Sequence, residues 1–192
     1  MIIFQPEIRK ALATLGSNPM IRAFSKGESS VTVSKLVQTA FSLRDRGLGG
    51  LVVIERKASL REFIEESGVS LDAEVSAPLI VSIFTPPSPL HDGAVIIKSG
   101  RIIGARVVLP LSDNPDIDPS LGTRHRAAIG ITEVSDSVAI VVSEERRSIR
   151  TAAEGKLSAP HTKESLGMVL RELLLTEALP PEEESISEEA IL

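Results

Sequence analysis

The sequence lacks cysteine, tryptophan and tyrosine altogether, and its 192 residues include only five phenylalanines. Without cysteine there can be no disulfide framework and no zinc site built on thiolates, a composition that fits a reducing compartment. With an aromatic share of 3%, the core must be packed from aliphatic side chains. A bound base would therefore have to lie against aliphatic groups or against one of the five phenylalanines.

The chain also lacks an excess of positive charge, because 26 acidic residues outnumber 21 basic ones, which gives a formal net charge of −5 and an isoelectric point near 5.3. A protein that grips a nucleic-acid backbone needs a basic surface, since neutralisation of phosphates supplies most of that affinity. We therefore expect no nucleic-acid partner. A small anion held by a local basic cluster remains compatible with this composition.

No long hydrophobic run opens the chain. Only four residues precede Gln5 and Pro6, which is too short for the apolar core of a signal peptide and far short of a membrane span. As given, the chain is expected to be soluble and cytoplasmic.

The length suits one domain, and hydrophobic periodicity predicts its elements. We expect helices over 6–16, from Thr32 or Ser34 to Gly47, over 59–67, from Thr123, and over 162–178. The expected strands cover 50–56, 79–84, 94–98, 101–109 and 137–145, with a short edge strand near 148–153. A loop containing Pro19 and Gly27 should precede the second helix, and Ser99-Gly100 should form a tight hairpin turn.

These elements predict an α/β fold, a single globular domain in which a mixed twisted β-sheet is flanked by helices on both faces. We divide the chain into an N-terminal helix and linker over 1–28, a globular domain over 29–179, and an acidic tail over 180–192 that we expect to be disordered.

Two arginines stand in the first turn of the helix predicted from Thr123. The positive end of a helix dipole disfavours cations, so Arg124 and Arg126 need a negative partner. A phosphate would serve, because the free N–H groups of that turn point outward and Gly122 leaves room for close approach. The alternative is that both arginines pair with acids of the loop over 113–120. His125 taken alone is more typical of a structural hydrogen-bonding residue than of a catalyst.

Carboxylates stand at the ends of two predicted strands. Asp92 follows a proline-rich loop and precedes Gly93, a position suited to a metal ligand or a base, although a lone Asp-Gly pair is also typical of a simple turn. The strand over 137–145 ends in Ser143, Glu144 and Glu145, which alternatively form an ordinary charged turn. Carboxylates of this kind suit Mg²⁺ or Mn²⁺. Together with the phosphate site, they predict phosphoryl or nucleotidyl transfer.

The motifs "DGA" at 92–94 and "GTRHRAA" at 122–128, joined by "LPLS" at 109–112 and followed by "VVSEE" at 141–145, resemble the diadenylate cyclase domain. This family condenses two ATP molecules into cyclic di-AMP and releases two pyrophosphates. The resemblance covers about residues 30–155, so the globular domain is expected to be the catalytic one. "FQPEIRKAL" at 4–12 resembles the segment that follows the membrane helices in the membrane-bound branch. The full-length protein is therefore expected to be membrane-anchored, with this domain in the cytoplasm.

The resemblance implies roles for individual residues. Asp92 is expected to activate the ribose 3′-hydroxyl for attack on the α-phosphate of the facing ATP. The other expected catalytic residues are Arg124, His125 and Arg126, which would hold the phosphates. The nucleotide and its phosphates are expected to contact Gly93, Ala94, Leu109 at the adenine, Gly122, Thr123, Arg124, Ser143, Glu144 and Glu145.

The resemblance also implies a metal ion and a partner. The expected ligands are Asp92, His91 and Glu145, and the ion is Mn²⁺, Mg²⁺ or Co²⁺. Each domain of this family binds one ATP, so a face-to-face homodimer is expected to be needed for catalysis, and a regulatory protein is a further expected partner. Val108 stands where relatives often carry a tyrosine beside the adenine. The alternative function is a non-catalytic module that binds ATP or cyclic di-AMP.

Overall fold

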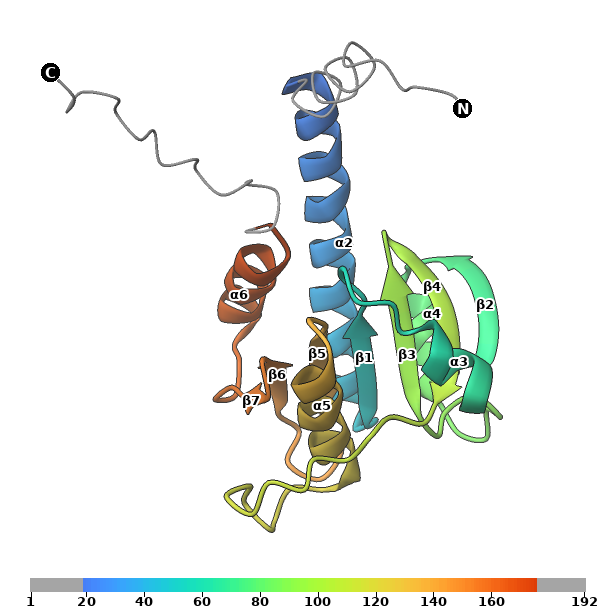
Figure 1. Cartoon of the computed structure of the whole chain (residues 1–192), viewed down its shortest axis with the longest axis vertical. Helices are drawn as coiled ribbons and strands as arrows, with labels where there is room; N and C mark the ends of the chain where they lie inside the picture. Colours follow the sequence, from blue (N-terminus) through green and yellow to red (C-terminus); the bar gives the residue numbers. More distant parts are fainter. Residues whose placement is uncertain (1–18, 176–192) are drawn as a thin grey trace, which may run out of the picture.

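The computed structural model describes residues 19–175, and its centre is a seven-stranded sheet in the order β2-β4-β3-β1-β5-β6-β7 (Figure 1). Only β1 and β3 run parallel, and every other neighbouring pair is antiparallel. The sheet is therefore mixed, as predicted. Its strands are β1 (Gly50–Ile54), β2 (Val69–Glu74), β3 (Ala94–Lys98), β4 (Arg101–Val107), β5 (Val138–Val142), β6 (Ile149–Ala153) and β7 (Lys156–Leu157).

Helices cover both faces of this sheet, which confirms the predicted layering (Figure 1). On the central strand β1, Val52 and Ile54 pack toward one layer of helices, while Leu51 and Val53 pack toward the other. Alternate side chains of a strand point to opposite faces, so each face receives its own aliphatic core. The first layer holds α2 (Pro19–Arg46), α4 (Ala77–Phe84) and α6 (Lys163–Leu175); the second holds α3 (Arg61–Ser67) and α5 (Thr123–Val134).

The hairpin between β3 and β4 follows the prediction from its turn residues. Ser99 and Gly100 both have positive φ, at 47° and 72°. Two left-handed residues in succession are what a type I′ turn requires, and this turn matches the twist of antiparallel strands. The helix from Thr123 and the strands β1 and β5 are also confirmed.

The predicted strand over 79–84 is wrong, because this segment belongs to the helix α4. Its helical spacing becomes visible only from two residues earlier, where Ala77, Ile80, Val81 and Phe84 form one buried face. Pro78 lies in the first turn, where its missing N–H costs no hydrogen bond. A short apolar run by itself does not distinguish a helix from a buried strand.

The strand β2 was missed, and it pairs with β4 at the edge of the sheet. At the opposite edge, the strand predicted near 148–153 is β6, and it is not an edge strand because β7 pairs with its outer side. The predicted loop containing Pro19 and Gly27 is also wrong, since α2 is continuous from Pro19 to Arg46. One glycine costs a helix only about 1 kcal/mol. The helix predicted over 6–16 and the acidic tail over 180–192 lie outside the described residues.

His161 connects the end of the sheet to the start of α6. Its Nε2 atom lies 2.9 Å from Thr151 Oγ1 and 2.8 Å from Ser158 Oγ, and its backbone N–H donates to the carbonyl oxygen of Ile149 at 2.8 Å. Burial lowers the pKa of His161 below the ordinary histidine value of 6.5. The neutral imidazole is therefore the form that the folded state favours.

This lowered pKa predicts a pH-dependent stability. As the pH falls through 6.5, the unfolded chain takes up protons before the folded chain does, so the free energy of unfolding should decrease and then level off below the lowered folded-state pKa. His161→Gln should flatten this dependence, because glutamine does not titrate. Urea unfolding of both proteins at a series of pH values measures the effect, and parallel curves would contradict it.

Candidate active site

The register of the sheet brings separate segments of the chain to one edge. Leu51 of β1 lies beside Ala94 of β3, so the residues before each of these parallel strands are neighbours. Gly50 pairs with Val142, which places the turn after β5 at the same edge. Ala94 also pairs with Val107, where β4 ends. These segments and the start of α5 therefore converge.

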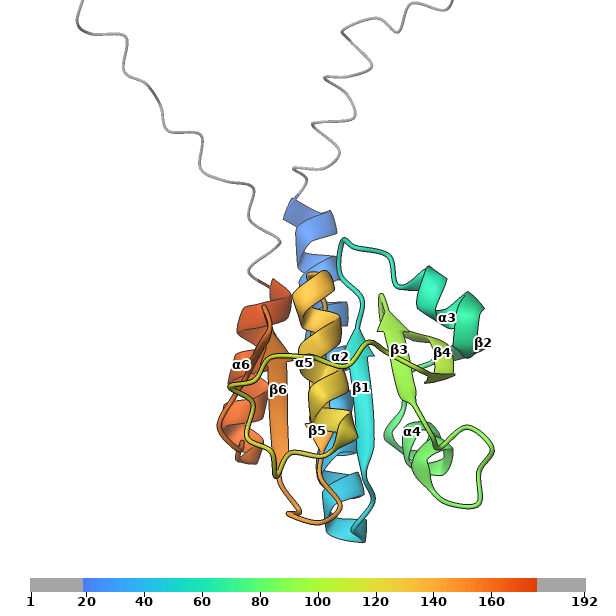
Figure 2. The ribbon, with the colours of Figure 1, turned by 60° about the horizontal axis from the view of Figure 1, so that its bottom comes forward.

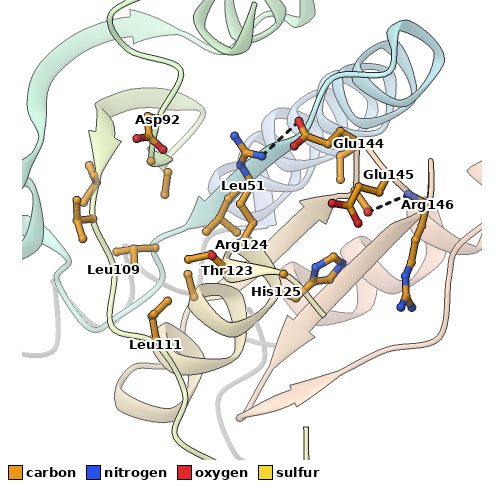
Figure 3. Close-up of a pocket in the computed structure, with 18 of the residues that line it drawn as sticks. Leu51, Asp92, Leu109, Leu111, Thr123, Arg124, His125, Glu144, Glu145 and Arg146 are labelled. Atoms are coloured by element: carbon orange, nitrogen blue, oxygen red, sulfur yellow. Dashed lines mark hydrogen bonds and ion pairs between the residues drawn. The ribbon is translucent and has the colours of Figure 1, made fainter. Parts of the chain in front are cut away.

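A pocket of about 540 Å³ lies at this convergence (Figure 3). Its volume falls within the range of small-molecule sites. One side is apolar, formed by residues 107–109, Leu51 and Leu111, and the other carries the polar end of β5. The predicted residues that line it are Asp92, Gly93, Ala94, Leu109, Gly122, Thr123, Arg124, His125, Ser143, Glu144 and Glu145.

The position of Asp92 depends on the glycine that follows it. Gly93 has φ +134°, a conformation that side chains rarely adopt, and a Cβ atom there would lie 2.6 Å from the backbone of Arg106. Glycine therefore allows the chain to pass close to β4 before β3 begins. Asp92 itself is exposed and reaches the pocket from the side of Leu109 (Figure 3).

The N-terminus of α5 opens directly into the pocket. Gly122 precedes the first turn, no side chain caps that turn, and a Cβ atom at Gly122 would have no neighbour within 4 Å. The unsatisfied N–H groups of a first turn carry positive partial charge and attract anions. The space beside Gly122 is open, and the phosphate expected there stays a prediction.

Arg124 lies across the pocket from Asp92 and faces Glu144 (Figure 3). Its Nη1 atom is 3.6 Å from Glu144 Oε2, so the pair is loose. Gly49 lies against both groups, since a Cβ atom there would come within 2.5 Å of Arg124 Nη1 and 2.8 Å of Glu144 Oε2. The absence of a side chain at Gly49 therefore lets the Arg124 guanidinium pack directly against the backbone.

His125 is a buried member of the pocket, with 5% of its surface exposed. Its Nε2 atom is buried and has no hydrogen-bond partner among residues 19–175. Burial lowers the pKa of His125, and the nearby charges of Arg150 and Arg146 lower it further. The imidazole is therefore neutral at neutral pH, and its Nε2 atom is a buried polar atom without a partner in the described part of the chain.

Arg126 does not line the pocket, although the sequence placed it with the phosphates. Its Nη1 atom donates to the carbonyl oxygen of Ser112 at 3.3 Å, and its own carbonyl accepts from Ser112 N–H at 3.1 Å. Gly130 allows the same loop to lie directly on α5, since a Cβ atom there would collide with the carbonyl oxygen of Pro110. Figure 2 shows the loop from β4 crossing α5. In this structure Arg126 anchors the segment that carries Leu111.

His91 also lies outside the residues that line the pocket. Its Nδ1 atom is 2.6 Å from the carbonyl oxygen of Ser88, within its own proline-rich loop. Asp92 and Glu145 do share the pocket but approach from opposite sides (Figure 3). Within the described part of the chain, no three carboxylate or imidazole side chains are grouped to hold a metal ion.

Apart from Val108, seven residues of the pocket were not predicted, namely Leu51, Val107, Leu111, Ser120, Ala127, Val142 and Arg146. Leu51 is a core residue of β1 whose approach to the pocket only the fold reveals. Ser120 ends the acidic loop, and its approach to the turn after β5 has no signal in the sequence. Arg146 follows Glu145 directly, so the motif "SEER" was the available signal, but only its first three residues were predicted to line the site.

Comparison with known proteins identifies the family of this chain. Residues 37–157 match the model of the DAC family, described as "DisA bacterial checkpoint controller nucleotide-binding". The chain belongs to the diadenylate cyclase domain family. The matched range contains every pocket segment described above, from Gly49 to the turn after β5.

Individual relatives support the assignment to the diadenylate cyclase domain family. The chain is 43% identical over 176 residues to "Cyclic di-AMP synthase CdaA" of Bacillus subtilis, an alignment that covers 88% of this chain and 63% of that relative. It therefore spans less than two thirds of that protein's length. The crystal structure of a double mutant of DacA from Staphylococcus aureus matches with a TM-score of 0.71 and 40% identity, covering 73% of this chain and 93% of that one.

A further solved structure belongs to a protein whose name refers to a membrane. It is that of a "hypothetical membrane spanning protein" from Bacillus cereus and matches with a TM-score of 0.64 and 42% identity, covering 67% of this chain and 63% of that one. Within residues 19–175 of the present chain, no helix combines the length and apolarity needed to cross a bilayer.

The contact at Gly49 gives a testable consequence. Gly49→Ala should displace the Arg124 guanidinium and weaken nucleotide binding about threefold to tenfold, while the melting temperature changes little because only flexible side-chain ends must move. Calorimetric titration with ATP and thermal unfolding measure the two effects. Gly167→Ala is the matched control, since its Cβ would meet no atom closer than 3.5 Å and lies on α6. Unchanged ATP affinity in Gly49→Ala would contradict the role of this backbone.

Proposed function

We propose that this chain is the catalytic domain of a diadenylate cyclase. Two subunits, each with one ATP, condense the two nucleotides into cyclic di-AMP and release two pyrophosphates. The observation that carries this proposal is one pocket in which the carboxylate of Asp92 faces an uncapped helix start bearing Arg124 and His125. Membership of the diadenylate cyclase domain family supports it.

The two sides of the pocket fit the two ends of ATP. The apolar side, with Leu109 and Leu111, suits the adenine, and the start of α5 suits the phosphates. Val108 lines the pocket with 66% of its surface exposed. Because it is aliphatic, it offers contact to the base without aromatic stacking.

Asp92 is the proposed base. Its carboxylate accepts the proton of a ribose 3′-hydroxyl, whose oxygen then attacks the α-phosphorus of the other ATP. The bond from that phosphorus to the bridging oxygen breaks, and pyrophosphate leaves. The same step on the second nucleotide closes the ring, so each cyclic di-AMP requires two attacks and two departures.

The N–H groups at the start of α5, together with Arg124, stabilise the charge that develops on the phosphates. The neutral ring of His125 lies beside this helix start, and it adds no positive charge of its own there. An attack on a second ATP needs a second nucleotide within reach. Two pockets facing each other across a dimer supply it and make the reaction effectively intramolecular.

The charges of the pocket also fit a divalent cation that arrives with the substrate. Three carboxylates, Asp92, Glu144 and Glu145, line it with only two guanidinium groups, Arg124 and Arg146. Mg²⁺ commonly uses one or two carboxylates together with substrate phosphates, and Mn²⁺ accepts the same kinds of ligand. Asp92 or Glu145 would then hold the ion, which would neutralise phosphate charge when bound. His91 would have to leave Ser88 to join them.

A binding module without catalysis is the alternative function. Such a module would use the start of α5 and Arg124 but would not need a carboxylate beside the ribose. The exposed Asp92, placed in the pocket by Gly93, favours the enzyme. We further propose that a segment outside the described residues holds the domain at the cytoplasmic face of a membrane, in line with the similarity to the membrane spanning protein from Bacillus cereus.

The first prediction of this function is turnover. The purified chain, incubated with ATP and Mn²⁺ or Mg²⁺, should release cyclic di-AMP and pyrophosphate, and EDTA should stop the reaction. Asp92→Asn should bind ATP but lose at least about a hundredfold in rate, the range of a general base. Asp113→Asn, on an exposed loop residue that does not line the pocket, is the control. Full activity of Asp92→Asn by chromatography and mass spectrometry would exclude Asp92 as the base.

The second prediction concerns the dimer. If two pockets must meet, the rate per subunit should rise with protein concentration until the dimer is saturated. Assays over a dilution series, paired with sedimentation of the same samples, test this. A constant rate per subunit in samples that sediment as monomers would contradict the two-subunit mechanism.

A further inference from the structure

Arg146 lies at the end of the pocket opposite the apolar side, where the adenine is proposed to bind. Figure 3 places Asp92, Leu109 and Leu111 on one side, the start of α5 in the middle, and Arg146 on the opposite side. A nucleotide whose base contacts Leu109 and whose α-phosphate lies at the start of α5 would extend its remaining phosphates toward Arg146.

The two guanidinium groups of the pocket differ in their partners. Arg124 faces the carboxylate of Glu144. Arg146 uses only its Nη2 atom, which donates to Ser120 Oγ at 2.5 Å and to Ser120 O at 3.3 Å, and both of these acceptors are neutral. Within residues 19–175 it forms no ion pair, and its Nε and Nη1 atoms make no hydrogen bond. Its charge and several donors are therefore available to a ligand.

The surroundings of Arg146 fix its backbone and orient its side chain. Its N–H donates to Ser143 Oγ at 3.2 Å, and Ser143 N–H donates to Ser148 O at 2.9 Å, which closes the turn after β5. Ser120 is in turn hydrogen-bonded to Asp118. The hydrogen bonds from Ser120 lower the pKa of Asp118, and the charge of Arg146 contributes a smaller part. The loop over 113–120 thus holds Arg146 in place through a serine rather than through a direct salt bridge to a carboxylate.

We propose that Arg146 is a substrate-binding residue that contacts the β- and γ-phosphates of ATP, with Ser120 as its positioning residue. This inference rests on the proposed function, because it takes ATP as the ligand. A guanidinium binds phosphate oxygens through paired N–H donors, and Arg146 can do so while Nη2 stays on Ser120. The same contact would stabilise the pyrophosphate as it leaves.

A different role would be purely structural, with Arg146 tying the loop over 113–120 to the turn after β5. The two roles predict different effects on the binding of nucleotides that carry different numbers of phosphates. A phosphate contact at this end affects a triphosphate and leaves AMP untouched, because AMP ends at the α-phosphate. Loss of a purely structural contact would distort the start of α5 as well and would weaken the binding of AMP and of ATP equally.

The experiment is calorimetric titration with AMP and with an ATP analogue that carries a methylene group between the α- and β-phosphorus atoms, both with Mg²⁺. Arg146→Ala should lower affinity for the ATP analogue about tenfold and leave affinity for AMP unchanged. Arg146→Lys should give an intermediate loss, since it keeps the charge but not the paired donors. Arg147→Ala is the matched control, because Arg147 is the next residue and does not line the pocket.

The proposal would be overturned if Arg146→Ala left the affinity for the ATP analogue at the value of Arg147→Ala, or weakened AMP and the analogue equally. Melting temperatures of all variants establish that they are folded. The proposed function fails separately: an unaltered chain that bound the analogue but made no cyclic di-AMP from ATP would not be a cyclase. The comparison of AMP with the analogue would still decide the role of Arg146.

Discussion

The pairing of β1 with β3 on one side and β5 on the other is the constraint on which the site depends. All five residues of β1 are buried, so its register is set by two aliphatic cores at once. A slip by one residue would exchange the two faces of the strand. The same register places Gly93 and the end of β5 beside the start of β1. The geometry of the pocket is therefore a consequence of hydrophobic packing within the sheet and its two layers.

Close backbone contacts then refine the pocket that the sheet provides. Gly93 lets Asp92 approach β4, Gly49 lets Arg124 and Glu144 lie across the start of β1, and Gly130 lets the loop carrying Leu111 rest on α5. A methyl group at any of these positions would meet atoms closer than van der Waals contact allows. Only Gly93 also needs its unusual φ. The polar groups can gather around the pocket because the residues beneath them are glycines, which have no side chain to keep them apart.

The sequence alone predicted the α/β class, the hairpin at Ser99-Gly100 and the helix start after Gly122. Each depends on interactions between near neighbours: alternation along a strand, two left-handed residues in a turn, and a glycine before a helical run. Because these interactions are local, they can be predicted without knowing how the rest of the chain folds. The segment over 79–84 was misassigned because a short, mostly apolar run satisfies a helix and a buried strand equally well until a neighbour is known.

Only the tertiary structure decided which side chains face the pocket. Arg124 and Arg126 are two residues apart on one helix and therefore point in different directions, one into the pocket and one onto Ser112. His91 adjoins Asp92 in sequence but turns back to its own loop, while Ser120 and Arg146 meet across 26 positions. Motifs show which groups are near along the chain. The direction of a side chain depends on contacts between segments that are distant in sequence, and those contacts form only when the sheet and its two helical layers pack together.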